Sequence, residues 1–317
     1  MNGDRLGVRW GLAGGTAITS IADARTVAQY AESAGFDSLW ISQGLGVDPI
    51  VALACVGDDC PSLTEVGTSV VPLYGRHPIG VAQLARTAQS ALGGRFTLGI
   101  GAASKNAVRD AMGLAWDHPL AFTREFIDGL QPLLTGATAE VTGSQLSTHA
   151  KLNIAAADTP ILLAALGPKM LDLAGRRVRG TSVGQCGPNT ISSYIAPSIR
   201  AAAEAAGRPE PRIMALIRLC VTDNPAPAFE LARETAAFYR TVPSYSRLQD
   251  MEALTEPAEL HLIGSWDRVL EGLHEYAAAG VTDFRLEIAA PSQHDRDATG
   301  DAFSNYLRNV PRLAQPT

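Results

Sequence analysis

Two short segments of small residues have the composition of a loop that holds a flat or anionic ligand. GIGAAS at residues 99–104 and ALGPKM at residues 165–170 each lead from an apolar run into a stretch with helical spacing. Glycine and alanine let backbone N–H groups approach a ligand, and a helix N-terminus attracts negative charge. Either segment alone is better explained as a tight turn. Because they occur together, we interpret them as a candidate cofactor cradle.

Side chains suited to acid–base chemistry are scarce around these segments. The expected strand ends carry no cluster of Asp, Glu and His like that of a metal hydrolase, and Lys169 begins a helix rather than ending a strand. No G-x-S-x-G nucleophile motif occurs. Cys55, Cys60, Cys186 and Cys220 form neither a C-x-x-C pair nor a His/Cys cluster, so we expect no metal site. This pattern favours a bound cofactor that supplies the chemistry.

A repeated alternation of β-rich and amphipathic helical runs must position these segments. We expect strands at residues 6–12, 36–42, 64–71, 95–101, 160–166, 180–184, 212–221 and 281–288. We expect helices at residues 20–34, 48–56, 78–92, 120–134, 169–177, 190–206, 267–279 and 302–313. Ser20 and Asp23 predict a capping box for the first helix, and Gly35 predicts its left-handed end.

Eight strand–helix repeats without a break in composition predict an α/β fold, a closed (β/α)8 TIM barrel in one domain spanning residues 1–317. An open, doubly wound sheet is the alternative, but no G-x-G-x-x-G fingerprint opens the first strand–helix turn. Two excursions lengthen the barrel. Residues 138–157 read as a hairpin, and residues 224–264 read as helical with an irregular break at TVPSYSRLQD.

The composition limits the partners of the chain. The net charge is −6 and charged residues make up 18% of the sequence, the wrong sign for a bulk-electrostatic binder of nucleic acid or of an anionic membrane. No apolar run is long enough to span a bilayer, and the N-terminus lacks the apolar core of a signal peptide. Four cysteines in a chain of 317 residues fit a reducing compartment. We therefore expect a cytoplasmic protein that acts on a small-molecule substrate.

Residues 67–104, GTSVVPLYGRHPIGVAQLARTAQSALGGRFTLGIGAAS, carry a long and specific family pattern. They resemble the bacterial luciferase-like superfamily, and within it the deazaflavin branch that uses coenzyme F420. GFDSLWIS at residues 35–42, PILLAALGPKMLDLAG at residues 160–175 and RGTSVG at residues 179–184 extend the resemblance over most of the chain. The branch includes methylenetetrahydromethanopterin reductase and F420-dependent glucose-6-phosphate dehydrogenase.

The resemblance implies which residues hold the cofactor. A bulge containing a non-prolyl cis peptide bond would lie between Ser69 and Val70, against the deazaflavin ring. The cofactor phosphate would meet the loop after the fourth strand, at Gly101, Ala102, Ala103 and Ser104. The backbone of Gly167 and Pro168 would line the ring or the tail, with Gly184 nearby at the end of the sixth strand.

One departure from the family pattern bears on the reaction. Members of the branch commonly continue the second strand with Asp-His, whereas this chain has Gln43 and Gly44. Gln43 can hydrogen-bond the ring through its amide, but Gly44 cannot act as the base that the sugar-phosphate dehydrogenase uses. Tyr74, just past the bulge, and Glu287, at the end of the eighth strand, are the remaining candidates for proton transfer.

The resemblance thus implies an F420-dependent oxidoreductase. A full cradle without a strong base favours a reductase that passes hydride from reduced F420 to an imine or an activated alkene. The alternatives are an FMN-dependent monooxygenase of the same superfamily and a protein that binds a deazaflavin without turnover. Family members are often homodimers, so a homodimer is also implied.

Overall fold

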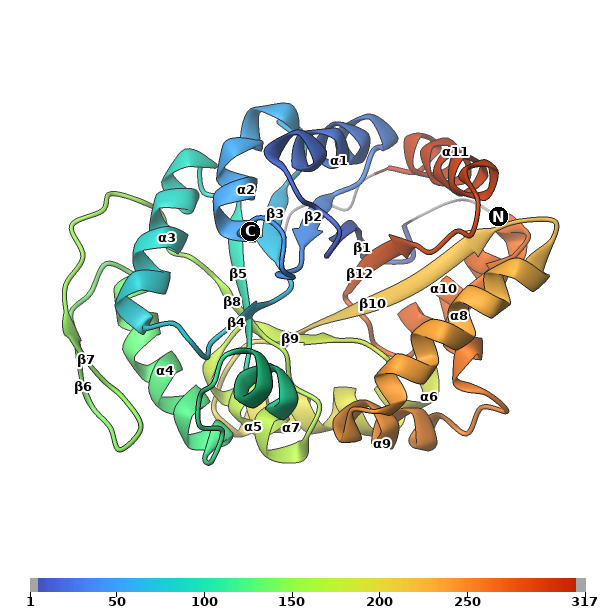
Figure 1. The fold of residues 1–317 in the computed structure, drawn as a ribbon. Helices are drawn as coiled ribbons and strands as arrows, with labels where there is room; N and C mark the ends of the chain where they lie inside the picture. Colours follow the sequence, from blue (N-terminus) through green and yellow to red (C-terminus); the bar gives the residue numbers. More distant parts are fainter. Residues whose placement is uncertain (1–4, 312–317) are drawn as a thin grey trace.

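Eight parallel strands close into a barrel in the computed structural model, which describes residues 5–311 (Figure 1). The strands are β1 (Arg9–Gly15), β2 (Ser38–Ile41), β3 (Glu65–Thr68), β5 (Phe96–Gly101), β8 (Ile161–Leu163), β9 (Gly180–Val183), β10 (Arg212–Val221) and β12 (Asp283–Ile288). The ring is closed because β10 pairs with both β9 and β12. The predicted (β/α)8 barrel is confirmed, and the open sheet is excluded.

Helices surround the barrel and join its strands (Figure 1). The longer ones are α1 (Ile21–Ala34), α2 (Pro49–Cys55), α3 (Pro78–Ala91), α4 (Pro119–Leu134), α5 (Pro168–Arg177), α7 (Ala196–Ala205), α10 (Trp266–Ala278) and α11 (Gln293–Asn309). Shorter pieces are η1 (Gly57–Asp59), η2 (Ala107–Ala111), α6 (Pro188–Thr190), η3 (Ile191–Ile195) and η4 (Pro257–Leu260). Within the described range, no helix is long and apolar enough to cross a membrane.

The excursions add elements to this plan. The first is the hairpin of β6 (Ala139–Thr142) and β7 (Ser147–Ala150), which lies outside the barrel next to α4. The second contains α8 (Pro225–Arg240), α9 (Pro243–Glu252) and β11 (Leu262–Gly264). Strand β11 pairs with the carboxyl-terminal end of β10. The hairpin is confirmed as predicted.

Local sequence signals explain where several elements begin and end. The capping box of Ser20 and Asp23 begins α1, and Gly35 ends it at a φ of 88°, both as predicted. The carboxylate of Asp48 accepts from the backbone N–H of Ile50 and Val51 at the start of α2.

Three boundaries differ from the sequence-based expectation. The strand expected at 64–71 is interrupted after Thr68, and the short β4 (Val71–Pro72) resumes pairing with β5. The segment expected to be an irregular break, residues 241–250, is mostly helix α9, because Pro243 begins a helix as readily as it ends one. The last helix starts at Gln293 behind the cap of Ser292, not at residue 302, and residues 312 and 313 of that expectation lie outside the described range.

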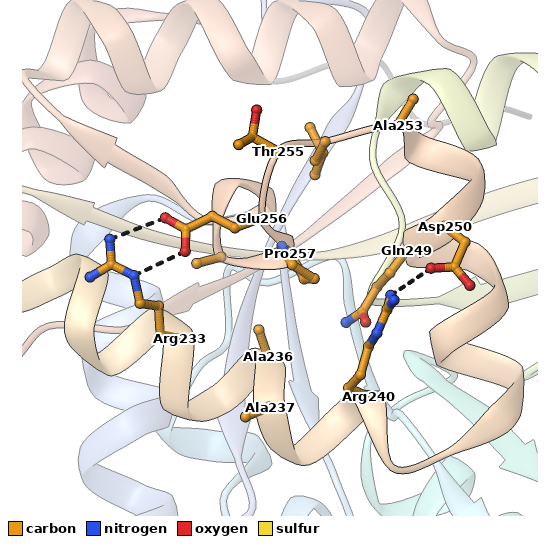
Figure 2. Close-up of a pocket in the computed structure, with 12 residues that line it drawn as sticks. Arg233, Ala236, Ala237, Arg240, Gln249, Asp250, Ala253, Thr255, Glu256 and Pro257 are labelled. Carbon is orange, nitrogen blue, oxygen red and sulfur yellow. Dashed lines mark hydrogen bonds and ion pairs between the residues drawn. The ribbon is translucent and has the colours of Figure 1, made fainter.

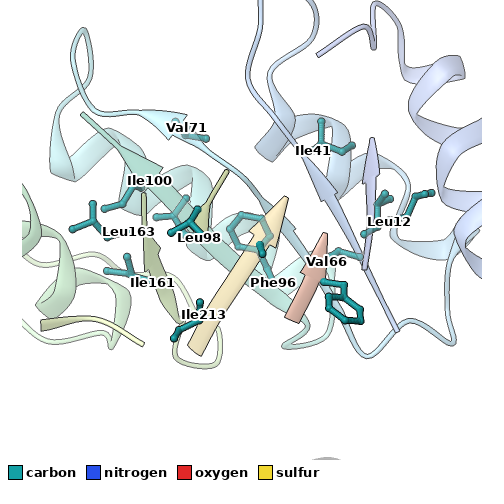
Figure 3. Packing of buried hydrophobic residues seen from close by; sticks show 14 of the residues in the cluster. Leu12, Ile41, Val66, Val71, Phe96, Leu98, Ile100, Ile161, Leu163 and Ile213 are labelled. Carbon is teal, nitrogen blue, oxygen red and sulfur yellow. The ribbon is translucent and has the colours of Figure 1, made fainter. Parts of the chain in front are cut away.

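Side chains fill both faces of the strands. Outward-facing residues such as Leu12, Ile41 and Leu98 pack against the helices (Figure 3). Inside the barrel, Trp40 packs with Leu162 and Met214 in a separate cluster. The bulk of Trp40 requires glycine opposite it, since a Cβ on Gly67 would lie 2.3 Å from the indole ring.

Charged side chains close the amino-terminal end of the barrel. The guanidinium of Arg212 lies 2.7 Å from the carboxylate of Glu65 and 2.8 Å from that of Asp283. Arg9 lies 2.7 Å from Asp283 and so joins the same cluster. Burial alone would raise the pKa of Glu65 and Asp283, but Arg212 and Arg9 outweigh it and hold both below their ordinary values.

Replacing Glu65 by Gln should destabilise the barrel, because Arg212 would keep its buried charge with one carboxylate fewer. We expect the free energy of unfolding to fall by about 3–5 kcal/mol at neutral pH in urea denaturation. Because the folded pKa is lowered, the carboxylate's contribution is present above the unfolded pKa of about 4.3 and disappears as the pH falls further. The loss caused by Glu65→Gln should therefore shrink in acid. The exposed Glu271→Gln change should stay close to wild type; equal losses in both variants would contradict the assignment.

Candidate functional site

A cavity of about 580 Å³ lies at the carboxyl ends of the barrel strands. Its lining comes from loops after several strands and from the second excursion. The lining includes Gln43, Ser69, Val70, Gly101, Ala102, Ala103, Ser104, Trp116, Gly167, Gly184, Arg218, Tyr239, Tyr245, Arg285 and Glu287. This is the face on which (β/α)8 barrels place their active sites.

One wall of the cavity is a backbone bulge after β3. The Ser69–Val70 peptide bond is cis, at the position that the family resemblance implied. The carbonyl of Ser69 accepts from the hydroxyl of Ser42 at 2.6 Å, and the Ser69 and Ser182 hydroxyls lie 2.9 Å apart. Hydrogen bonds from the residue after β2 and from β9, which is not adjacent to β3 in the barrel, therefore hold this bulge in place.

The loop after β5 fits closely against the bulge. A Cβ on Gly101 would lie 2.9 Å from Val70 Cγ2, so a larger residue would displace the bulge. Ala103 adopts a left-handed conformation with φ of 60°. The hydroxyl of Ser104 accepts from the backbone N–H of Ala107 at 3.2 Å and begins the next helical turn. The chain thus presents a sharp turn of small residues to the cavity.

A second loop of small residues follows β8. Gly167 precedes α5 with extended backbone, and a Cβ built on it would have no neighbour within 4 Å. Gly184, after β9, also lines the cavity. A side chain at Gly167 would therefore enter open space at the cavity wall rather than the core.

The opposite wall is made of polar side chains that the sequence analysis did not single out, apart from Glu287. Arg218 Nε lies 3.0 Å from Glu287 Oε2, and Arg218 Nη2 donates to the hydroxyl of Tyr239 at 3.1 Å. The rings of Tyr239 and Tyr245 meet edge to face with centroids 5.1 Å apart. This wall supplies a fixed ion pair and two phenols.

Arg285 lies at the base of this wall and is 7% exposed. Its Nη1 donates to the carbonyl of Ser69 and, at 3.4 Å, to the hydroxyl of Ser42. Burial, with the nearby charge of Arg218, lowers the pKa of Arg285 to about 10. The guanidinium thus connects the backbone bulge to the polar wall.

The sequence signal that indicates these arginines is the recurrence of charged residues at alternate positions along a strand. Asp283, Arg285 and Glu287 alternate along β12, and Arg212 and Arg218 are six residues apart on β10. In a barrel, residues of the same parity on one strand point to the same side. Charges recurring at that spacing inside a predicted barrel strand therefore indicate a polar interior.

Helix α9 brings Tyr245 to the cavity and is anchored by one carboxylate. Glu252, 3% exposed, accepts hydrogen bonds of 2.9 Å from the backbone N–H of Gly187, Asn189 and Thr190. These groups begin the helical segment after β9, where N–H groups lack partners within the helix. The excursion is thereby tied to the barrel.

The structure brings most of the predicted site residues together. Those that line the cavity are Gln43, Ser69, Val70, Gly101, Ala102, Ala103, Ser104, Gly167, Gly184 and Glu287. The amide oxygen of Gln43 accepts from Arg76 at 2.9 Å, and Arg76 also pairs with Asp48.

Two predicted residues do not line it. Tyr74 stacks on Phe122 with ring centroids 4.3 Å apart and is 7% exposed, so its phenol packs outside the cavity. Burial, together with the charge of Asp117, raises the pKa of Tyr74. Pro168 is the first residue of α5 and is not part of the lining, although Gly167 before it and Met170 after it are.

A second hollow, of about 460 Å³, lies between α8 and α9 (Figure 2). The charged side chains that line this hollow form ion pairs with one another. Arg233 pairs with Glu256 at 2.9 Å, and Arg240 pairs with Asp250 at 2.7 Å. These pairs leave no net charge for a ligand. Across residues 5–311, no group of three or more His, Cys, Asp or Glu side chains could hold a metal ion.

Replacing Glu252 by Ala should loosen α9, because three backbone N–H groups, two of them buried, would lose their acceptor. We expect amide hydrogen exchange within residues 243–252 to accelerate about tenfold or more, while the barrel strands keep their protection. Asp250→Asn, on the same helix but in an exposed ion pair, is the control and should leave exchange unchanged. Wild-type exchange rates in the Glu252 variant would show that packing alone holds the helix.

Comparison with known proteins agrees with this architecture. Residues 8–283 match the family model described as luciferase-like monooxygenase. A 5,10-methylenetetrahydromethanopterin reductase of Methanolobus tindarius is 32% identical over 182 residues, which cover 57% of this chain and 55% of that protein. The chain thus aligns with about half the length of this relative.

Two solved structures share the fold over nearly the whole chain. An F420-dependent secondary alcohol dehydrogenase, solved with an F420–acetone adduct, superposes with a TM-score of 0.82 at 19% identity, covering 96% of this chain and 99% of that one. A coenzyme F420-dependent tetrahydromethanopterin reductase from Methanopyrus kandleri superposes with a TM-score of 0.74 at 21% identity, covering 96% and 98%. The family model covers most of the sequence, and on that match the chain belongs to the luciferase-like monooxygenase family.

Proposed function

We propose that this protein is an F420-dependent oxidoreductase, and specifically a reductase that delivers hydride to an imine or an activated alkene of a small molecule. The observation that carries the proposal is the division of the cavity into a backbone cradle of small residues and a polar wall that lacks a free base. Such a site suits a cofactor that brings its own reactive centre. The two F420-dependent enzymes among the similar solved structures support the choice of cofactor.

The residues present fit a deazaflavin with an anionic tail. Gln43 and the Ser69–Val70 bulge would lie along the ring, and Gly184 would border it. The turn at 101–104 would meet the phosphate through its backbone, and Gly167 leaves space beside the cradle that a side chain would fill. When bound, the group would supply the hydride. The protein would position the substrate and limit water access.

The protein must also supply a proton to the reduced substrate. Glu287 has its carboxylate engaged by Arg218, and the Tyr239 hydroxyl also meets Arg218. Tyr245 has no hydrogen bond to its hydroxyl within the described residues, and burial, followed by the influence of Tyr239, raises its pKa. The phenol of Tyr245 is therefore protonated at neutral pH, and we assign it as the proton donor.

The direction of the reaction follows from what the second strand lacks. Gly44 stands where members of the deazaflavin branch commonly carry a histidine, the base in the sugar-phosphate dehydrogenase, so this position offers no base for abstraction of a hydroxyl proton. Donation of a proton from a phenol remains possible. This difference favours reduction over alcohol oxidation.

The proposal includes a homodimer in the cytoplasm. Leu45, Val51 and Leu84 are exposed apolar side chains on or beside α2 and α3, two helices that pack together. Exposed apolar residues on neighbouring elements favour contact with a second copy.

Titration with F420 and with FMN tests the cofactor, and Gly167→Leu provides the matched variant. Trp116 lines the cavity, so we expect F420 to quench tryptophan fluorescence and FMN to bind much more weakly. Gly167→Leu should abolish F420 binding while the free energy of unfolding stays within about 1 kcal/mol of wild type, because the new side chain enters the cavity and not the core. Gly80→Leu, on α3 and equally open, is the control and should bind normally. Tight binding of FMN alone would refute the proposal.

Tyr245→Phe should lower the turnover number for oxidation of reduced F420 by about 100-fold or more, with F420 binding unchanged. The reason is loss of the phenolic proton at a cavity position that is otherwise preserved. The oxidants are a panel of imines and enones that includes both neutral and carboxylate-bearing members. Tyr30→Phe, in α1 and away from the cavity, should retain full activity. Unchanged turnover in Tyr245→Phe would exclude the phenol as donor, and absence of turnover in the wild type across the panel would favour a binding protein.

A further inference from the structure

Two buried arginines on β10 and β12 have opposite electrostatic surroundings. Arg212, at the amino-terminal end of the barrel, lies within 2.8 Å of two carboxylates, Glu65 and Asp283. Arg285, at the carboxyl-terminal end, has no carboxylate at ion-pairing distance among the described residues, and the nearby Glu287 pairs instead with Arg218. The barrel thus neutralises one buried guanidinium and leaves the other uncompensated.

The hydrogen bonds of Arg285 leave much of its guanidinium unused. Nη1 donates to the Ser69 carbonyl and the Ser42 hydroxyl. Nε is buried and has no partner, and within the described chain Nη2 makes no hydrogen bond. Since the side chain lines the cavity, a ligand there can reach the guanidinium.

A buried cation without an anion is costly, and buried charges in proteins are ordinarily paired. An anionic ligand in the cavity would supply the partner that Arg285 lacks. Burial lowers the pKa of Arg285 to about 10, and no paired carboxylate offsets that effect. At Arg212 the two carboxylates outweigh burial and raise the pKa of the guanidinium. Arg285 is therefore still charged at neutral pH. The charged residues that line the cavity are Arg218, Arg285 and Glu287, which sum to one positive charge.

We propose that Arg285 binds a carboxylate of the substrate, so that the protein reduces unsaturated or imino acids in preference to neutral enones and imines. This proposal rests on the proposed function of the same cavity. A planar guanidinium matches the two oxygens of a carboxylate, which a point charge does not.

The position of Arg285 favours the substrate over the cofactor tail as the source of that carboxylate. Arg285 contacts the bulge at Ser69, beside which the ring would lie, whereas the phosphate and glutamates of the tail would extend from the turn at 101–104. The carboxylate near Arg285 is thus expected at the reacting end of the cavity.

The first measurement uses the cofactor-free protein and two probes of nearly equal shape, benzoate and benzamide. Trp116 fluorescence reports occupation of the cavity, and Trp116→Phe should remove the signal. We expect wild type to bind benzoate about 30-fold or more tightly than benzamide, and Arg285→Gln to abolish the difference. Arg285→Lys should retain only part of it, and Arg240→Gln, in an exposed ion pair outside the cavity, should retain all of it. Thermal unfolding checks that each variant is folded. If Arg285→Gln does not fold, the test rests on whether Arg285→Lys has a smaller preference for benzoate than wild type.

The second measurement separates the two sources of a carboxylate. F420 and the deazaflavin riboside without phosphate and glutamates are titrated against wild type and Arg285→Gln. We expect the substitution to change both affinities by the same factor, because any effect that passes through the bulge at Ser69 acts on the ring that the two molecules share. A loss confined to F420 would assign Arg285 to the tail and overturn the proposal.

Failure of this inference is distinguishable from failure of the proposed function. Normal F420 binding with equal affinities for benzoate and benzamide in wild type would overturn the carboxylate site alone. A benzoate preference that Arg285→Gln abolishes, in a protein that binds no F420, would support the carboxylate site and refute the proposed cofactor.

Discussion

The closed ring of strands depends on interior positions that each accept only certain side chains. At one end Arg212 joins Glu65 and Asp283, which come from strands on different sides of the barrel. In the middle, Trp40 fills the interior against Gly67. These two layers occupy the barrel below the cavity, so a ligand can enter only at the carboxyl-terminal end. The place of the site follows from the way in which the interior is filled.

The sequence was most informative where local chemistry determines structure. The capping box at Ser20, the glycine end at Gly35 and the alternation of strands and helices were readable without tertiary information. Residues 241–250 are predicted as an irregular break but are mostly helix, because a proline such as Pro243 can either end or begin a helix. Tertiary contacts of α9, such as those of Glu252, decide between the two.

The two walls of the cavity also differ in how far the sequence predicts them. Its cradle was predictable because small residues at strand ends recur in a long family pattern. The polar wall was not, since Tyr239 and Tyr245 lie on an excursion and Arg218 and Arg285 lie within strands. The sequence predicts Tyr74 at the site because the residue follows the bulge closely. It does not reveal that the ring stacks on Phe122 instead.

The attachment of α9 has a consequence for how this enzyme family can diversify. The cradle is built from barrel loops, whereas two phenols of the opposite wall arrive on a segment that Glu252 fastens through backbone N–H groups. The fastening nevertheless restricts the barrel side, because a Cβ on Gly187 would lie 2.5 Å from Glu252 Oε1. Helix α9 also reaches the cradle, since Arg247 donates to the carbonyl of Leu166 in the loop after β8. A new substrate wall would therefore require matched changes in the barrel loops that receive it.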